Sequence, residues 1–223
     1  MCERIALFVS QLAAVRILLR RVGLLRSLQA GWAIVTVPRV AQPLVDVEAH
    51  GERGTKLACR QLRPLILLYR VLAQRPHWGD AFTHIRALVL DAGMPFMRVN
   101  LGNLAPRRLG RMSPRRRRRF VESRGRRFFN AQIRWDSIAA DRVQFTVLRC
   151  VYPQLCRQAG APELAPLFCE VDAHYFGRIE AGVQLHRAET IAAGAQSCPF
   201  VLVATASAAG SAEAGERQAS DSS

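Results

Sequence analysis

The sequence of 223 residues predicts an α+β protein, in which an antiparallel sheet of about four strands has helices packed on one face, after an N-terminal helical extension. The first half carries apolar residues at spacings of three and four, as amphipathic helices do. From Ala131 onward the spacing shortens to two, and strand-like segments come in two pairs with helical segments between them. Helices followed by clustered strands are typical of an antiparallel sheet rather than of alternating β-α units.

The first predicted helix covers residues 3–29. Its apolar residues recur at helical spacing, whereas Arg16, Arg20 and Arg26 fall on other faces. We interpret this basic amphipathic helix as docked on its own domain or on a partner subunit. The alternative is that it lies on an anionic membrane.

Residues 1–55 are expected to form an N-terminal helical extension of the main domain, which covers residues 56–203. Residues 33–37 are rich in β-branched side chains and predict a short strand. Residues 38–54 contain two prolines and two glycines, which favour a loop between the two parts. Residues 204–223 have no large apolar side chain, and we expect a disordered tail.

Helices are expected in the first part of the main domain. Pro64 is tolerated in the first turn of one helix, Asp80 caps the next, and Gly93 with Pro95 ends it. Ser113 and Pro114 form a typical helix start. The predicted helices cover residues 62–74, 80–92 and 115–123, with another short helical turn at 94–101.

In the second part of the main domain, segments with the two-residue spacing of strands alternate with segments with the spacing of helices. A turn near residues 139–141 joins the first two strands into a hairpin. In the second strand Val143, Phe145, Val147 and Arg149 alternate with the residues between them, so they are expected on one face. The predicted strands cover residues 131–136, 142–150, 183–187 and 199–203, and the predicted helices 152–159 and 163–176.

The net charge of +15 is concentrated in one segment. From Arg107 to Arg127 there are eleven arginines and one acid, Glu122, which leaves +10 in this stretch. Such a segment binds RNA or another polyanion through phosphates, or it is a solvated basic helix in an arginine-rich composition. No nucleic-acid-binding motif accompanies it, so we regard binding of nucleic acid as the less favoured interpretation.

The six cysteines contain no C-x-x-C pair. The apolar run at residues 5–15 is too short to span a bilayer, which takes about 20 residues, and it has no signal-peptide cleavage pattern. We therefore expect a cytoplasmic protein with reduced thiols. The sequence does not define its oligomeric state.

Five short motifs follow one another in the second half of the chain. They read F-T-V-L-R-C-V-Y at residues 145–152, G-A-P-E-L at 160–164, L-F-C-E-V-D at 167–172, R-A-E-T-I-A-A-G at 187–194 and C-P-F at 198–200. In this order and spacing they resemble the L-2-amino-thiazoline-4-carboxylic acid hydrolase family. The resemblance covers residues 124–203 and extends more weakly back to residue 62. One departure is Pro199, where the family usually has Asp.

The resemblance implies a hydrolase that opens a 2-amino-thiazoline ring to an N-carbamoyl cysteine, and so a role in cysteine metabolism. The ring carbon is amidine-like and needs a nucleophile, a proton for the departing sulfur and a cation for the substrate carboxylate. Arg149 and Arg187 are candidates for that cation, as bidentate forks. Thr190 belongs to the same motif, although a threonine followed by Gly194 is also typical of a turn.

Three cysteines and one acid are the candidate catalytic residues. Cys169 and Asp172 are three residues apart on a predicted helix, so they share a face. Cys150 ends one strand and Cys198 begins another, so both are expected to meet over that helix. Three thiolates and a carboxylate also suit Zn²⁺, although their spacing matches no standard zinc motif, and the cofactor stays undefined. Buried cysteines serve equally as small apolar side chains.

These observations favour a hydrolase that acts on a small cyclic amidine-like substrate at a C–N or C–S carbon. The first alternative is a catalytically divergent member of the same fold that binds a small ligand or a metal, which Pro199 favours. The second alternative is a basic protein that binds polyanions through residues 107–127.

Overall fold

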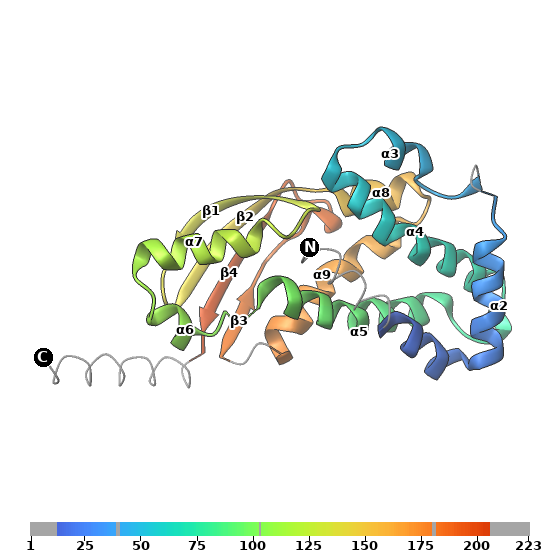
Figure 1. The fold of residues 1–223 in the computed structure, drawn as a ribbon, viewed down its shortest axis with the longest axis horizontal. Helices are drawn as coiled ribbons and strands as arrows, with labels where there is room; N and C mark the ends of the chain where they lie inside the picture. Colours follow the sequence, from blue (N-terminus) through green and yellow to red (C-terminus); the bar gives the residue numbers. More distant parts are fainter. Residues whose placement is uncertain (1–12, 39–40, 103, 180–181, 206–223) are drawn as a thin grey trace, which may run out of the picture.

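The computed structural model describes residues 13–38, 41–102, 104–179 and 182–205. It confirms the predicted α+β class. Four strands form one antiparallel sheet in the order β1-β2-β4-β3, at one end of an elongated molecule, and helix α7 (Pro114–Gly125) runs along one face of that sheet (Figure 1). The strands are β1 (Ala131–Ile138), β2 (Arg142–Cys150), β3 (Val183–His186) and β4 (Cys198–Ala204).

The inner face of the sheet carries alternating apolar residues from its two central strands. Val143 and Val147 of β2 are buried, as are Phe200 and Leu202 of β4. All four predicted strands are present within a few residues of their expected bounds, because the two-residue period of a half-buried strand is a strong local signal.

A β-bulge near the end of β2 changes the direction of its last side chains. Gln132 pairs with Arg149 and Ile133 pairs with Val147, so Leu148 has no partner in β1. The extra residue turns Cys150 to the face of Val147 and leaves Arg149 exposed. The strict alternation expected for this strand, which put Arg149 beside Val147, is therefore wrong at this point.

The N-terminal helices differ from the prediction in their bounds. Residues 13–22 are helical, the chain turns at Gly23 with a φ of 85°, and α2 (Leu24–Val35) follows. Positive φ at this junction suits glycine. Residues 3–12 of the predicted helix lie outside the described residues. The strand predicted at residues 33–37 is wrong, because α2 continues to Val35 and Ile34 packs against the core, so tertiary packing overrides the β-branched preference.

A short helix, α3 (Val45–His50), lies inside the predicted loop. It is followed by α4 (Arg53–Ala73), which is much longer than predicted and holds Pro64 in its interior. Ala30 of α2 and Leu62 of α4 belong to the same buried cluster, so the N-terminal helices share the core of the main domain.

Helix α5 (Ala81–Leu101) runs through Gly93 and Pro95, which were expected to end it. Asp80 caps its first turn as predicted, since its carboxylate accepts a hydrogen bond from the Thr83 N–H at 2.7 Å. The helix continues because one long apolar face, from Ile85 to Leu101, is buried against the core.

The helices of the second half are α6 (Pro106–Gly110), α7 (Pro114–Gly125), α8 (Val151–Gln158) and α9 (Ala165–His174). Helix α7 packs on β1, and α8 and α9 connect the two strand pairs. Short helical turns are η2 (Pro76–Trp78), η3 (Pro162–Leu164), the π-helical η4 (Tyr175–Ile179) and η5 (Ile191–Ala193). The helices predicted at residues 115–123, 152–159 and 163–176 are confirmed, whereas α6, η2 and η5 were not predicted.

Among the described residues, no helix is long and apolar enough to cross a membrane. The predicted tail falls mostly on residues 206–223, which lie outside the described part of the chain.

Gly93 holds the helix that carries the candidate site close to α5. A Cβ at this position would lie 2.7 Å from Cγ1 of Val171, a buried residue of α9. We expect Gly93→Ala to lower the free energy of unfolding by about 1–3 kcal/mol, because the crowded core must shift. Chemical denaturation measures this change. Gly31→Ala in α2 is the matched control, since nothing lies within 4 Å of its added Cβ. An equally stable Gly93→Ala protein would contradict the close crossing.

Candidate functional site

A buried ion pair joins three segments of the fold. Arg187, the residue after β3, donates from Nη1 to Oδ2 of Asp172 at 2.9 Å and from Nη2 to the carbonyl oxygen of Cys169 at 2.8 Å. Its guanidinium also lies 4.8 Å from the centre of the Phe200 ring in β4. The Arg187 side chain is 9% exposed and that of Asp172 is 24% exposed. The pair therefore fixes the face of α9 that bears Asp172 against the sheet.

The environment of Asp172 favours its protonated form more than water does. Burial raises the pKa of Asp172 to about 6, although the charge and hydrogen bond of Arg187 act in the opposite direction. A carboxylate with a pKa near neutrality can accept a proton in one step and return it in the next, as a general acid-base catalyst must.

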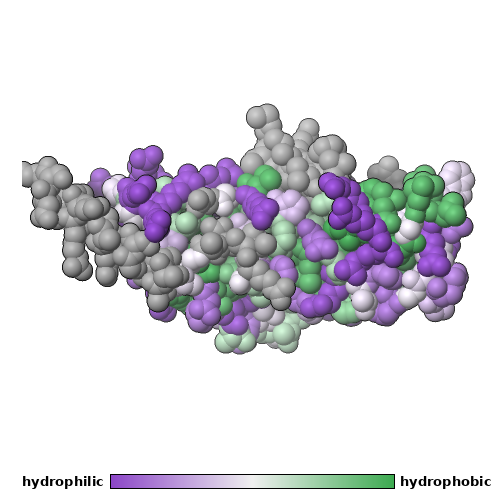
Figure 2. Space-filling model, turned by 90° about the horizontal axis from the view of Figure 1, so that it is seen from below, coloured by the Kyte–Doolittle hydropathy of each residue, from purple (hydrophilic) through white to green (hydrophobic). Residues whose placement is uncertain are grey.

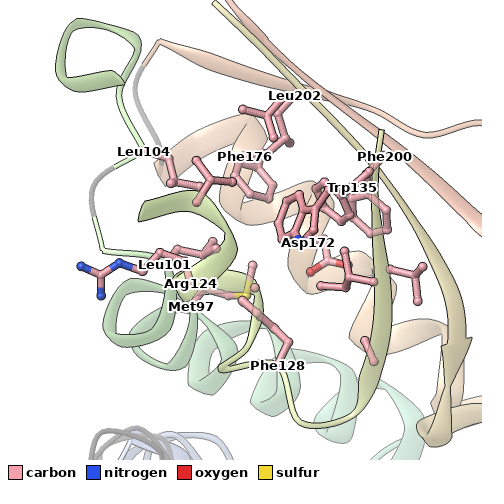
Figure 3. Close-up of a pocket in the computed structure, with 17 residues that line it drawn as sticks. Met97, Leu101, Leu104, Arg124, Phe128, Trp135, Asp172, Phe176, Phe200 and Leu202 are labelled. Atoms are coloured by element: carbon pink, nitrogen blue, oxygen red, sulfur yellow. The ribbon is translucent and has the colours of Figure 1, made fainter. Parts of the chain in front are cut away.

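Asp172 faces a cavity of about 90 Å³ between the inner face of the sheet and helices α5 and α7. Its carboxylate lies among the aromatic side chains of Trp135, Phe176 and Phe200 (Figure 3). Besides Asp172, Arg124 is the only charged residue of the lining, and its guanidinium points away from the cavity and lies over the ring of Phe120 (Figure 3). The other lining residues are Met97, Leu101, Leu104, Val121, Gly125, Phe128, Ala131, Ile133, Val143, Phe145, Val147 and Leu202. The exposed part of Asp172 is thus presented to an apolar hollow.

The structure brings Cys150, Cys169 and Cys198 into the neighbourhood of Asp172. The three thiols lie close enough to Asp172, and to one another, to perturb each other's ionisation. The Cys198 sulfur accepts a hydrogen bond from the Ile191 N–H at 3.1 Å. None of the three belongs to the cavity lining. Asp172 is therefore the residue that lies next to both the three thiols and the cavity.

The three thiols are poor nucleophiles as they stand. Burial raises the pKa of each of them, that of Cys169 to about 11, and the negative charge of Asp172 acts in the same direction. Arg187 lowers the pKa of Cys169 and Cys198, but burial is the larger effect. Since the thiolate is the reactive form, attack by any of these sulfurs requires a base that removes its proton.

Two of the predicted substrate-binding residues lie elsewhere. Arg149 is exposed beyond the β2 bulge and does not line the cavity. Thr190 caps η5, where its Oγ1 accepts a hydrogen bond from the Ala193 N–H at 3.2 Å, and Gly194 ends the turn with a φ of 100°. This turn holds the Ile191 N–H against Cys198, so Thr190 acts through the backbone.

Pro199 pairs with Thr146 of β2, on the face opposite to Cys198 and Phe200. Thr146 donates a hydrogen bond to Asp136 at 2.7 Å and accepts one from Arg134 at 3.3 Å. Strand β3 pairs with β4 only from Val201 onward, so the missing N–H of Pro199 falls where β4 has a single neighbour.

Within the described part of the chain, no group of three or more His, Cys, Asp and Glu side chains is arranged to hold a metal ion. The zinc site considered from the sequence therefore has no support in the geometry of Cys150, Cys169, Asp172 and Cys198.

Sequence reasoning missed the cavity and two positioning groups. Asn130 donates from Nδ2 towards the Cys150 sulfur at 3.8 Å, and the Ile191 N–H reaches Cys198. The aromatic lining had a signal, because Trp135, Phe145 and Phe200 fall at inward positions of neighbouring strands. The Ile191 N–H had no signal in the sequence, since an N–H group is common to every residue except proline.

Some side chains of the arginine segment, residues 107–127, donate hydrogen bonds to carbonyl oxygens of the protein itself. Arg117 donates to the carbonyl oxygens of Leu109 and Met112, and Arg127 to those of Val99 and Asn100. A surface depression of about 460 Å³ lies among the arginines of this segment. Its lining includes Arg107, Arg108, Arg111 and Arg116.

Together these features define a small α+β protein with a buried acid that opens onto an apolar cavity beside three thiols. A family model for L-2-amino-thiazoline-4-carboxylic acid hydrolase matches residues 84–202, and the chain belongs to that family. The resemblance inferred from the motifs is thereby confirmed. No curated protein and no solved structure shows significant similarity to this chain.

Arg187→Met tests the buried pair. Without its cation the buried carboxylate of Asp172 is stabilised less, so its folded-state pKa rises further above the usual value of 3.8. The loss of stability is therefore greater at about pH 8, where Asp172 must ionise, than at about pH 5, where it is protonated. We expect a cost of about 3–5 kcal/mol at the higher pH, measured by denaturation.

Arg86→Met is the matched control for that substitution. Its ion pair with Glu170 spans 2.7 Å, but the two side chains are 52% and 38% exposed. A cost below about 1 kcal/mol is expected, because water screens the pair. Equal effects of the two substitutions would show that the Arg187 pair is no more buried in solution than the surface pair.

Proposed function

We propose that the protein is a hydrolase that opens a small cyclic amidine-like substrate, with Asp172 as the general acid-base group. The observation that carries this proposal is the position of Asp172: a carboxylate with a pKa of about 6 opens onto an apolar cavity of about 90 Å³. The family of the chain supports the type of reaction. A cytoplasmic location is part of the same proposal, and the oligomeric state is left open.

The proposed reaction uses water as the nucleophile. The ionised carboxylate of Asp172 accepts a proton from water while the water oxygen bonds to the amidine-like carbon. The resulting tetrahedral species breaks its bond to the ring sulfur or nitrogen, and the departing atom takes the proton back from Asp172. One water molecule is consumed, the ring opens, and the carboxylate is regenerated. Arg187 is a positioning residue in this scheme, because it orients Asp172 through Oδ2.

A thiol of Cys150, Cys169 or Cys198 is the alternative nucleophile. Its proton would pass to Asp172, which interacts electrostatically with all three. The sulfur would bond to the amidine-like carbon, and the ring bond to sulfur or nitrogen would break as the departing atom takes that proton from Asp172. Water would then add to the same carbon and expel the thiol, which receives the proton of the water through Asp172. We favour water, since burial raises the pKa of the Cys169 thiol to about 11 and makes its deprotonation unfavourable.

The lining of the cavity favours a substrate with an apolar body. A substrate carboxylate would need a cation, but both guanidinium ends of Arg187 already donate to Asp172 and Cys169. A flat apolar ring suits this lining, which includes Trp135 and Phe200, with a protonated amidine edge towards Asp172. An analogue of L-2-amino-thiazoline-4-carboxylate that lacks the carboxylate is therefore the better probe.

A divergent, non-catalytic member would use the same cavity only to bind such a ligand. Calorimetry separates the two functions: binding of the analogue without product formation favours the binding protein, and turnover favours the hydrolase.

The activity of the hydrolase should depend on the ionisation of Asp172. Because the base form is required and burial raises the pKa to about 6, kcat/KM for the analogue rises with pH and is half-maximal near that value. Asp172→Asn should lower kcat by about 10²- to 10⁴-fold and abolish the pH dependence. Product formation followed at several pH values measures both effects.

Asp136→Asn is the control, since Asp136 lies on the outer face of the sheet and bonds Thr146 and Arg134. Full activity of that variant is expected. Turnover by Asp172→Asn at the original rate would remove Asp172 from the proposed mechanism.

Polyanion binding is a second candidate function, which the depression lined by four arginines favours. Replacing Arg107, Arg111 and Arg116 by Gln should weaken binding to single-stranded RNA or heparin. The salt dependence should also flatten, by about one unit of slope for each phosphate that is no longer neutralised. Fluorescence anisotropy at several salt concentrations measures both changes.

Replacing the exposed Arg142, Arg149 and Arg157 by Gln is the charge-matched control for that triple variant. Equal losses of affinity in the two triple variants would indicate non-specific attraction to net charge.

A further inference from the structure

The exposed large apolar side chains gather on the first two described helices. Eight such side chains are exposed in the described part of the chain, and only Leu148 lies outside this region. Val15 and Leu19 are on the helix of residues 13–22, and the others are on α2. Those on α2 are Leu24, Leu25, Leu28, Trp32 and Val35, with exposed fractions of 61–78%. Figure 2 shows hydrophobic side chains at the right-hand end of the molecule, where α2 lies in Figure 1.

On α2 these residues form one continuous stripe. Leu25, Leu28, Trp32 and Val35 follow one another at spacings of three and four, which places them on one side of a helix. The side that meets the core is different: Ser27 and Ala30 are buried, and α2 packs against α4. Helix α2 is therefore apolar on two sides, and its own domain covers only one of them.

The charge along this part of the sequence has a single sign. From Arg4 to Val45 the sequence has six arginines and no acidic residue. Arg16, Arg20, Arg21 and Arg26 are exposed on the same two helices. A stripe of leucine and tryptophan beside arginines matches the interface of an anionic bilayer, where apolar side chains enter the acyl boundary and guanidinium groups bind the headgroups.

We propose that this two-helix face, defined by Val15, Leu19, Leu24, Leu25, Leu28, Trp32 and Val35, docks on the surface of an anionic membrane. Trp32 suits the headgroup level, where indole rings are enriched. The Trp32 side chain is 72% exposed, which is unfavourable for an indole ring in water, whereas the headgroup region of a bilayer accommodates it. This docking is peripheral and does not depend on the proposed catalytic activity.

The test is sedimentation of the full-length protein with vesicles. Vesicles of phosphatidylglycerol and phosphatidylcholine in equal parts should bind it, and vesicles of phosphatidylcholine alone should bind it far less. Added salt should weaken the binding, because it screens the arginines. Leu25→Glu combined with Leu28→Glu should lower the partition coefficient by about tenfold or more, since two inserted side chains become repelled anions.

Leu148→Glu is the matched control, because it exchanges the one exposed large apolar side chain outside this face in the described part of the chain and should leave binding unchanged. Failure of the unaltered protein to bind anionic vesicles would overturn the proposal. So would unchanged binding by the Leu25→Glu, Leu28→Glu variant, which would assign the attraction to the arginines of residues 107–127. A dimer in light scattering that this variant turns into a monomer, without vesicle binding, would assign the face to a second copy of the chain.

Discussion

The ion pair of Arg187 and Asp172 is the interaction on which the candidate site depends. A carboxylate buried beside an apolar cavity is costly to ionise, and without a cation it would remain protonated well above neutrality. Arg187 offsets that cost and bonds the carbonyl oxygen of Cys169 as well, so it holds the helix that bears the acid against the strands. The same contact therefore sets the orientation of Asp172, the packing of α9 on the sheet and a pKa of about 6.

The charge balance around this pair explains how the thiols relate to it. Burial raises the pKa of Cys150, Cys169 and Cys198, and the negative charge of Asp172 adds a smaller effect in the same direction. One negative charge is consequently the most that this buried region accommodates next to a single guanidinium. At neutral pH that charge resides on Asp172 and the thiols are neutral. A thiol can become nucleophilic only by passing its proton to Asp172, so the four groups share one charge whichever nucleophile the reaction uses.

Much of the fold could be predicted because its signals are local. The Asp80 cap, the helix start at Pro114 and the alternating strands depend on a few neighbouring residues, and they appear where expected. The prolines misled the prediction: Pro64 and Pro95 lie inside long helices that are stabilised by burial of a whole face. In the site, the placement of Cys169 and Asp172 on one face of a helix followed from their spacing. Cys150 was expected to approach Cys198 because the two residues lie at strand ends, but strict alternation would have directed its side chain to the outer face. The bulge at Leu148, which arises from pairing with β1, turns it inward. The exposed position of Arg149, which the same bulge determines, could not be inferred from one strand alone.

The place of Pro199 bears on whether this member can retain hydrolytic chemistry. The residue lies between Cys198 and Phe200, whose side chains point to the inner face, so its own side chain is directed to the outer face beside Thr146. An aspartate at position 199 would there face the hydrogen-bonded group of Asp136 and Arg134, on the opposite side of the sheet from the cavity. Its absence leaves the charge of the cavity unchanged, because the acid of the cavity comes from helix α9. Proline in place of aspartate at position 199 is therefore compatible with a reaction that depends on Asp172. Any effect of Pro199 on that reaction would have to arise from a change in the sheet.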